Sequence, residues 1–132
     1  MKQPVWILGD AVEAIHKRQL AEHGGSEGVC DAGLLASAMA RPQNTFAYED
    51  GVSLARLAAQ YMVGLARKRP FVEGSVRTAI VAGLLFLRLN GKTVNAIPED
   101  CYRVFRKLSE MEFGAGKLEK WLQVRLKGIE RK

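Results

Sequence analysis

The chain has 132 residues, of which 48% are hydrophobic and 26% charged, and its formal net charge is +6. This length is sufficient for one domain, residues 1–132, that buries a core without disulfides, a metal or a cofactor. The longest apolar run, residues 79–87, is too short to span a bilayer, and the N-terminal apolar segment is too short for a signal peptide. We therefore expect a cytoplasmic protein without membrane contacts, in which Cys30 and Cys101 remain reduced.

The charge is distributed unevenly along the chain. Residues 1–66 carry a net charge of −2, whereas residues 67–132 carry +8. The basic half could face a nucleotide, a nucleic acid or an acidic protein, or it could consist of solvated helix faces. Nucleic acid is the least favoured partner, because the basic C-terminal residues 125–132 have no interleaved aromatic side chains.

The N-terminal part of the chain has the apolar periodicity of helices. Asp10 followed by Glu13 indicates a capping box, and Gly24-Gly25 is a typical helix end. Asp31 is the expected N-cap of a short second helix, which Pro42 should end. Residues 45–48 then read as an irregular aromatic segment packed on the body of the domain.

The longest helical patterns come next. Ser53 is expected to cap a helix that runs up to Arg69. Residues 76–89 are apolar nearly all round, which predicts a central, buried helix. Asn90-Gly91 should end this helix, and residues 93–95 are expected to be extended.

Two further helices are predicted in the C-terminal part. Pro98 is a favourable first residue for a helix, and Gly114 and Gly116 separate it from a last helix that carries apolar residues as far as Leu126. The whole pattern predicts an all-α fold: a compact single-domain bundle of about six helices, with at most a short extended segment near residues 93–95.

The most informative stretch is the loop between the third and fourth predicted helices, Arg69-Pro70-Phe71-Val72-Glu73-Gly74-Ser75-Val76-Arg77-Thr78. Pro70 should stop one helix, Gly74 provides a turn, and helical pattern resumes near Val76. A loop that leads into a helix N-terminus presents free backbone N–H groups and the positive end of the helix dipole to an anion. Arg77 would lie on the first turn, where it could bind phosphate in a bidentate manner.

This loop resembles the motif of the Fic/Doc family, which in the Doc ("death on curing") branch reads His-Pro-Phe-x-Asp-Gly-Asn-Lys-Arg-Thr. Other pieces resemble that branch in the same order along the chain. They are Ala14-Ile15-His16, Gly24-Gly25, Asp31-x-Gly33-Leu34-Leu35, residues 38–43, Phe46-Ala47-Tyr48-Glu49 and residues 84–91. The resemblance covers roughly residues 10–126.

The resemblance implies a fold, an activity and partners. Fic proteins usually transfer AMP from Mg-ATP to a hydroxyl of a target protein, whereas Doc toxins transfer a phosphate, with a translation elongation factor as target. A Doc toxin is encoded beside an antitoxin whose C-terminal segment folds into a groove of the toxin and blocks it. These properties are implied by the resemblance alone.

Four residues of the loop stand at motif positions that have a role in the family. Phe71 stands at the position that anchors the loop in the core, and Gly74 at the position that keeps the backbone close to the anion. Glu73 stands where the family has an acidic residue, and an acid there can hold Mg²⁺ beside the phosphates. Arg77 matches the arginine that pairs with phosphate.

Three other residues depart from the motif: Arg69 replaces the catalytic His, Ser75 replaces Asn, and Val76 replaces Lys or Gly. An arginine stays protonated and cannot act as a general base, and loss of such a base typically costs about 10²–10⁴-fold in rate. Val76 removes a potential phosphate cation, so nucleotide binding should be weakened. His16 and His23 are expected to lie on the first helix, far from the loop, with His16 in a structural role.

Two hypotheses therefore remain open. The chain could be a Doc-like transferase whose chemistry is lost or altered, with Gly74, Ser75, Val76 and Arg77 around the phosphates. Alternatively, it could be a Doc-like binding protein without catalysis that contacts an antitoxin or a translation factor. Three departures within ten residues favour a naturally degenerate site over a single inactivating change.

Overall fold

The computed structural model describes residues 3–25, 31–68, 70–71, 75–96, 98–109 and 114–129. These residues form six helices and two short strands, which confirms the predicted helical fold. In chain order the elements are α1 (Gly9–His23), α2 (Ala32–Tyr48), α3 (Leu54–Lys68), α4 (Ser75–Leu89), β1 (Lys92–Val94), α5 (Pro98–Ser109), α6 (Ala115–Gln123) and β2 (Leu126–Gly128). None of the helices in the described stretches is long and apolar enough to cross a membrane.

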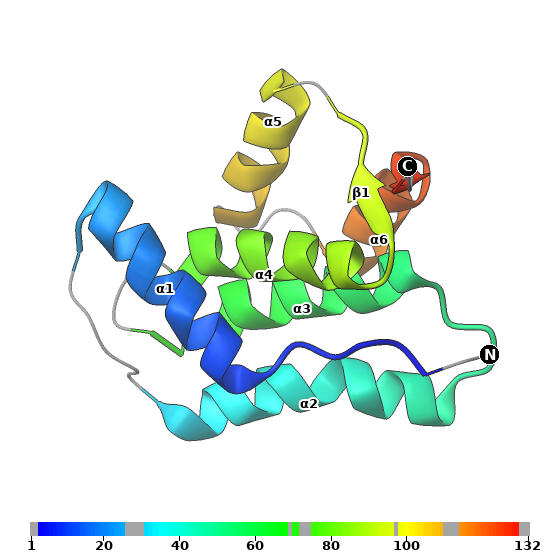
Figure 1. Ribbon diagram of the computed structural model, residues 1–132, viewed down its shortest axis with the longest axis horizontal. Coiled ribbons are helices and arrows are strands. Elements are labelled where there is room, and N and C mark those ends of the chain that lie inside the picture. Colours follow the sequence, from blue (N-terminus) through cyan, green and yellow to red (C-terminus); the bar gives the residue numbers. More distant parts are fainter. Residues whose placement is uncertain are drawn as a thin grey trace.

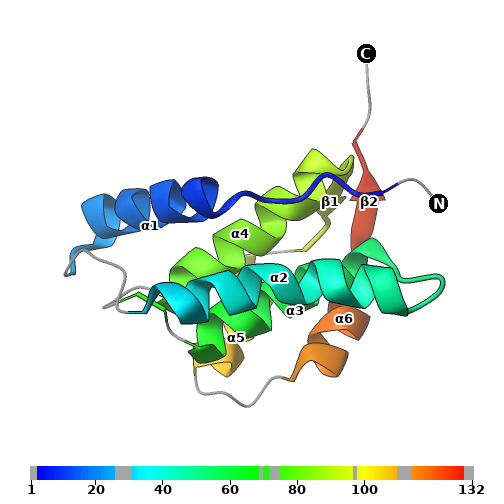
Figure 2. The same cartoon turned by 90° about the horizontal axis from the view of Figure 1, so that it is seen from below.

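Helix α3 is the centre of the fold. It packs against α2, α4, α5 and α6, and Figures 1 and 2 show α3 and α4 lying side by side with α2 along one flank. The predicted central, buried helix corresponds to α4, which packs against α1, α3, α5 and β1. Burial is deeper in α3, of which eleven residues are buried, whereas α4 leaves Arg77, Leu84 and Arg88 exposed. Small residues on α3 permit this close packing; for example, a Cβ added at Gly64 would lie 3.7 Å from the Cβ of Ala38 on α2.

Helix α2 continues through Pro42 to Tyr48, so the predicted helix end at Pro42 and the irregular segment at residues 45–48 were both wrong. A proline inside a helix costs about 3 kcal/mol. Pro42 is fully buried, and Phe46 packs edge-on against Trp6 with the ring centroids 5.8 Å apart. Tertiary packing of the second half of α2 therefore outweighs the local preference for a break.

Most of the predicted helix ends are confirmed. The Asp31 side chain accepts the N–H of Leu34 at 3.0 Å, and Ser53 Oγ accepts the N–H of Arg56 at 3.1 Å. Gly24 adopts φ +81° after α1. The capping box at Asp10 was wrong, because α1 begins at Gly9 and its N-cap residue makes no side-chain bond; Asp10 instead complements the dipole from within the first turn.

The C-terminal part differs from the prediction in one element. Strand β1 corresponds to the expected extended segment, and it pairs antiparallel with β2, with Val94 opposite Leu126. Leu126 was predicted to belong to the last helix, but α6 ends at Gln123 and the chain turns back, where the Arg125 carbonyl accepts the N–H of Asn95 at 2.7 Å. The second strand exists only because β1 provides a partner for it.

Candidate functional site

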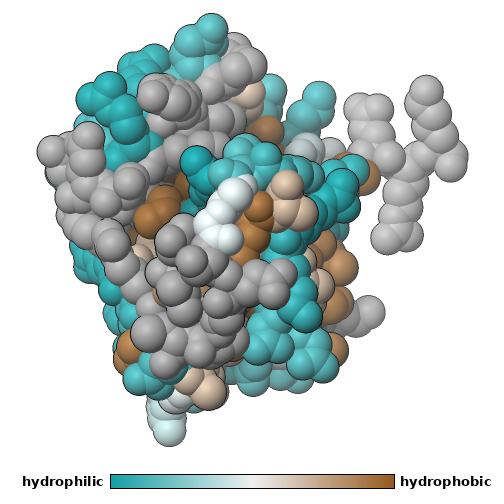
Figure 3. Space-filling model, turned by 90° about the vertical axis from the view of Figure 1, so that its left-hand side faces the viewer, coloured by the Kyte–Doolittle hydropathy of each residue, from teal (hydrophilic) through white to brown (hydrophobic). Residues whose placement is uncertain are grey.

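The predicted anion loop joins the end of α3 to the start of α4. Of its residues, the structure describes Pro70, Phe71 and the first turn of α4. Arg69, Glu73 and Gly74 lie outside the described residues, so their predicted roles stay predictions. Figure 3 shows this end of the molecule, where both hydrophilic and hydrophobic described residues border the grey atoms.

Phe71 is buried in the core, with 3% of its surface exposed. Its ring lies flat against the imidazole of His16 on α1, with the centroids 4.0 Å apart and the planes 13° apart. Its backbone N–H donates to Ser75 Oγ at 3.3 Å. Phe71 is therefore held by side chains from two different helices, His16 of α1 and Ser75 of α4.

Pro70 connects the loop to a third helix. It is fully buried, and its carbonyl accepts the backbone N–H of Asp31 at 3.2 Å. Asp31 also caps α2 through its carboxylate. The start of the loop and the start of α2 are thus joined at one residue.

The first turn of α4 presents one cation to solvent. Ser75 is 6% exposed, and its hydroxyl points inward to the loop backbone. Val76 is half-buried and packs on the core. Arg77 is exposed, and none of the ion pairs between described residues involves it. In this arrangement Ser75 and Val76 could contact an anion only through their backbone N–H groups, whereas Arg77 can do so with its guanidinium.

The expectation that His16 lies far from the loop was wrong. His16 is 3% exposed and shares the buried face of α1 with Val12 and Leu20, and α1 packs against α4. The spacing of Val12, His16 and Leu20, four residues apart, places them on one helix face. That spacing was the signal in the sequence that could have located His16 on the buried side.

Several concave surfaces lie outside the loop. A groove of about 490 Å³ runs between the start of α1 and α2, and its lining includes Leu8, Asp10, Glu13, Ala36 and Met39. An apolar cavity of about 380 Å³ lies between α4, β1, α5 and α6. Among the described residues, no group of three or more His, Cys, Asp or Glu side chains could hold a metal ion.

The described residues form a helical core, with a loop that leads into the N-terminus of α4 and its exposed Arg77. The Fic/DOC family model matches residues 6–87, which include α1 to α3, the loop and nearly all of α4. The chain therefore belongs to the Fic/Doc family.

Two relatives narrow the comparison to one branch of this family. The chain is 37% identical over 93 residues to the "Protein kinase doc" of Escherichia phage P1, and the aligned residues make up 70% of this chain and 74% of that protein. It is 44% identical over 69 residues to the "Toxin Doc" of Mycolicibacterium smegmatis (strain ATCC 700084 / mc(2)155), and here the aligned residues make up 52% of this chain and 53% of that protein.

Proposed function

We propose that this chain is a Doc-like toxin of a toxin–antitoxin module, whose loop derives from a phosphate- or AMP-transferase site and whose transfer activity is lost or altered. The names and identities of the two relatives support the toxin role. The main structural support for an anion site is the exposed Arg77 on the first turn of α4, next to the Phe71–Ser75 hydrogen bond.

The proposed ligand is Mg-ATP, which would supply the phosphoryl or adenylyl group for transfer to a protein hydroxyl. Arg77 and backbone N–H groups at the start of α4 would hold phosphates, and Glu73 would contact Mg²⁺. Val76 turns toward the core, where the family motif has a cation or glycine, so binding should be weaker than in a complete site. Arg69 can pair with phosphate, but it cannot accept a proton from an attacking hydroxyl.

A transfer assay tests the proposal. The purified protein is incubated with Mg²⁺, α- or γ-labelled ATP and a bacterial lysate, beside an Arg69→His/Val76→Lys variant. Ser75→Asn is added in a separate triple variant, because Ser75 is buried and the larger side chain could disturb the loop. Arg77→Ala in each background is the negative control.

The labels separate the possible outcomes. Labelling by the wild type shows that transfer does not need a histidine at position 69, and the label that moves distinguishes phosphate from AMP. Labelling by a reverted form alone shows that the site is degenerate. If no form labels a protein and none binds ATP, the loop is not a nucleotide site and this part of the proposal is wrong.

The second candidate is a Doc-like binding protein without catalysis. It is favoured by the inward positions of Ser75 and Val76, which leave a single outward cation on the first turn of α4. In this case Arg69→Ala changes no enzymatic readout, and a translation elongation factor or an antitoxin still binds. Failure to co-purify any product of the neighbouring genes would contradict it.

The proposed antitoxin segment has a candidate position in the groove between α1 and α2. Both helices contact the loop, α1 through His16 and α2 through Asp31, so a ligand between them would act close to the site. Ala36→Arg places a long cation in this groove and should prevent neutralisation of the toxin by co-expressed antitoxin. Ala47→Arg, exposed on the same helix but outside the groove lining, is the matched control.

A further inference from the structure

His16 is a polar residue buried on a helix face that is otherwise apolar. Its neighbours on that face are Val12 and Leu20, and only 3% of the His16 surface is exposed. The His16 ring is thus enclosed by the core of the domain.

One of the contacts of His16 is with the loop. Its imidazole lies on the ring of Phe71, with the centroids 4.0 Å apart and an interplanar angle of 13°. The geometry of such a stack is specific, because two flat rings in contact restrict each other's rotation about the side-chain torsions. An aliphatic side chain of similar size would fill the space without holding the plane of the Phe71 ring.

Phe71 in turn lies close to the proposed anion site. Its backbone N–H donates to Ser75 Oγ at the first residue of α4, two residues before Arg77. A change in the orientation of Phe71 would therefore reach the helix N-terminus through one hydrogen bond. Sites that bind charged groups are sensitive to such changes, since displacements of about 1 Å can reduce their effectiveness severalfold or more.

We propose that His16 is a positioning residue of the anion loop: its ring holds Phe71, and through the Phe71–Ser75 bond it holds the start of α4. The role is indirect, because His16 is buried and acts through Phe71. The part of the inference that concerns nucleotide binding rests on the proposed function, whereas the part that concerns loop order does not.

The test compares His16→Phe, which keeps a flat ring, with His16→Leu, which has no ring. The first measurement is hydrogen exchange of the Phe71 amide by NMR. The reference is the Arg56 amide, which is held by Ser53 Oγ in the same kind of bond but lies on α3. We expect His16→Leu to accelerate exchange at Phe71 at least tenfold and to leave Arg56 within twofold, while His16→Phe leaves both within twofold.

The second measurement is the dissociation constant for Mg-ATP, which should rise at least fivefold in His16→Leu and remain within twofold in His16→Phe. Accelerated exchange at Phe71 with no ATP binding by any form would support the positioning role and contradict the nucleotide site. Unchanged exchange at Phe71 in His16→Leu would overturn the positioning role, whatever the affinity for ATP.

Phe71→Leu removes the other ring of the same stack. It therefore tests the same contact if His16→Leu fails to fold. It should accelerate exchange of the residue 71 amide to a similar extent. Where both single variants fold, the double variant should add little to either, since both remove the same interaction. Fully additive effects would contradict the proposal.

Discussion

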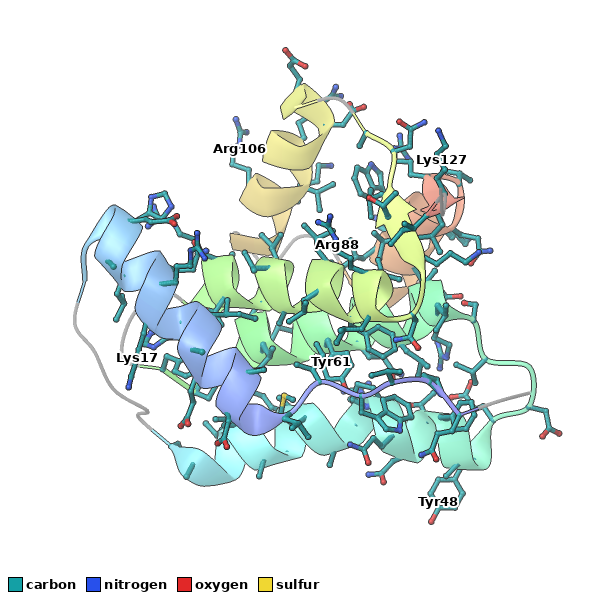
Figure 4. All side chains as sticks on the ribbon, viewed as in Figure 1. Lys17, Tyr48, Tyr61, Arg88, Arg106 and Lys127 are labelled. Carbon is teal, nitrogen blue, oxygen red and sulfur yellow. The ribbon has the colours of Figure 1, made fainter. Side chains whose placement is uncertain are left out.

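Tyr61 provides a stability prediction that depends on burial of a single hydroxyl. It lies on α3 in the centre of the molecule, 0% exposed, with the Phe86 ring 5.1 Å away (Figure 4). Burial raises the pKa of Tyr61 to about 12 from an ordinary value of 10.0, and the backbone of Ile7 has a smaller, opposite effect. The hydroxyl therefore holds its proton more tightly in the folded chain than in the unfolded chain.

The sign of the pH effect follows from these two pKa values. Below pH 10 Tyr61 is neutral in both states and its full contribution to stability is present. Between pH 10 and 12 the unfolded state releases the proton and the folded state does not, so stability falls as the pH rises. At pH 11 the residue is about 90% ionised when unfolded and about 10% when folded, and the loss is about 1.4 kcal/mol.

Urea denaturation of the wild type and of Tyr61→Phe at pH 8, 10 and 11 measures this loss. The quantity compared is the difference between their free energies of unfolding, because the contributions of the other titrating groups cancel in that difference. The difference should shift by about 1.4 kcal/mol in favour of Tyr61→Phe between pH 8 and pH 11. Tyr48, 88% exposed at the end of α2, is the control; its ring meets water in both states, so Tyr48→Phe should follow the wild-type curve. The reasoning would be refuted if the difference in free energy of unfolding between the wild type and Tyr61→Phe stayed constant from pH 8 to pH 11 within the extrapolation error.

Three further changes can be measured by urea denaturation. Asp31→Ala should destabilise the protein by about 1 kcal/mol through loss of the α2 cap, whereas Asp31→Asn should retain most of the stability; equal losses would contradict the capping role. Gly83→Ala places a Cβ against the side chain of Met62, and the overpacking cost of about 1–3 kcal/mol should exceed the helix-propensity gain of about 1 kcal/mol. Combination with Met62→Ala should cost less than the sum of the two single changes, and strict additivity would show that the two residues do not clash. Arg56 pairs with Glu49 at 2.8 Å and Glu119 at 3.3 Å across partly exposed surface, so Arg56→Met should cost less than about 1 kcal/mol; a loss above about 2 kcal/mol would show that the network is more than a surface pair.

Within the candidate site, the sequence identified the loop but not its contacts. The end of α3 before Pro70 and the start of α4 at Ser75 agree closely with the prediction. The inward direction of Ser75 and the contact between His16 and Phe71 could not be predicted, because they depend on how α1 packs against α4. The positions of Arg69 and Glu73 remain predictions.

The features that the sequence by itself determined are those that depend on residues within about four positions of each other. The caps at Asp31 and Ser53 and the turn at Gly24 belong to this group, since a cap bond or a positive φ is a property of the local backbone. The periodicity of apolar residues likewise determined the helical class of the fold.

Only the tertiary structure decided the features that rest on contacts between distant segments. Helix α2 passes through Pro42 because packing such as that of Phe46 on Trp6 compensates for the local cost. Strand β2 replaces the end of a predicted helix because β1 supplies its hydrogen-bond partner. His16 reaches the loop, 55 residues further along the chain at Phe71, because burial of the apolar faces of α1 and α4 brings these two rings together.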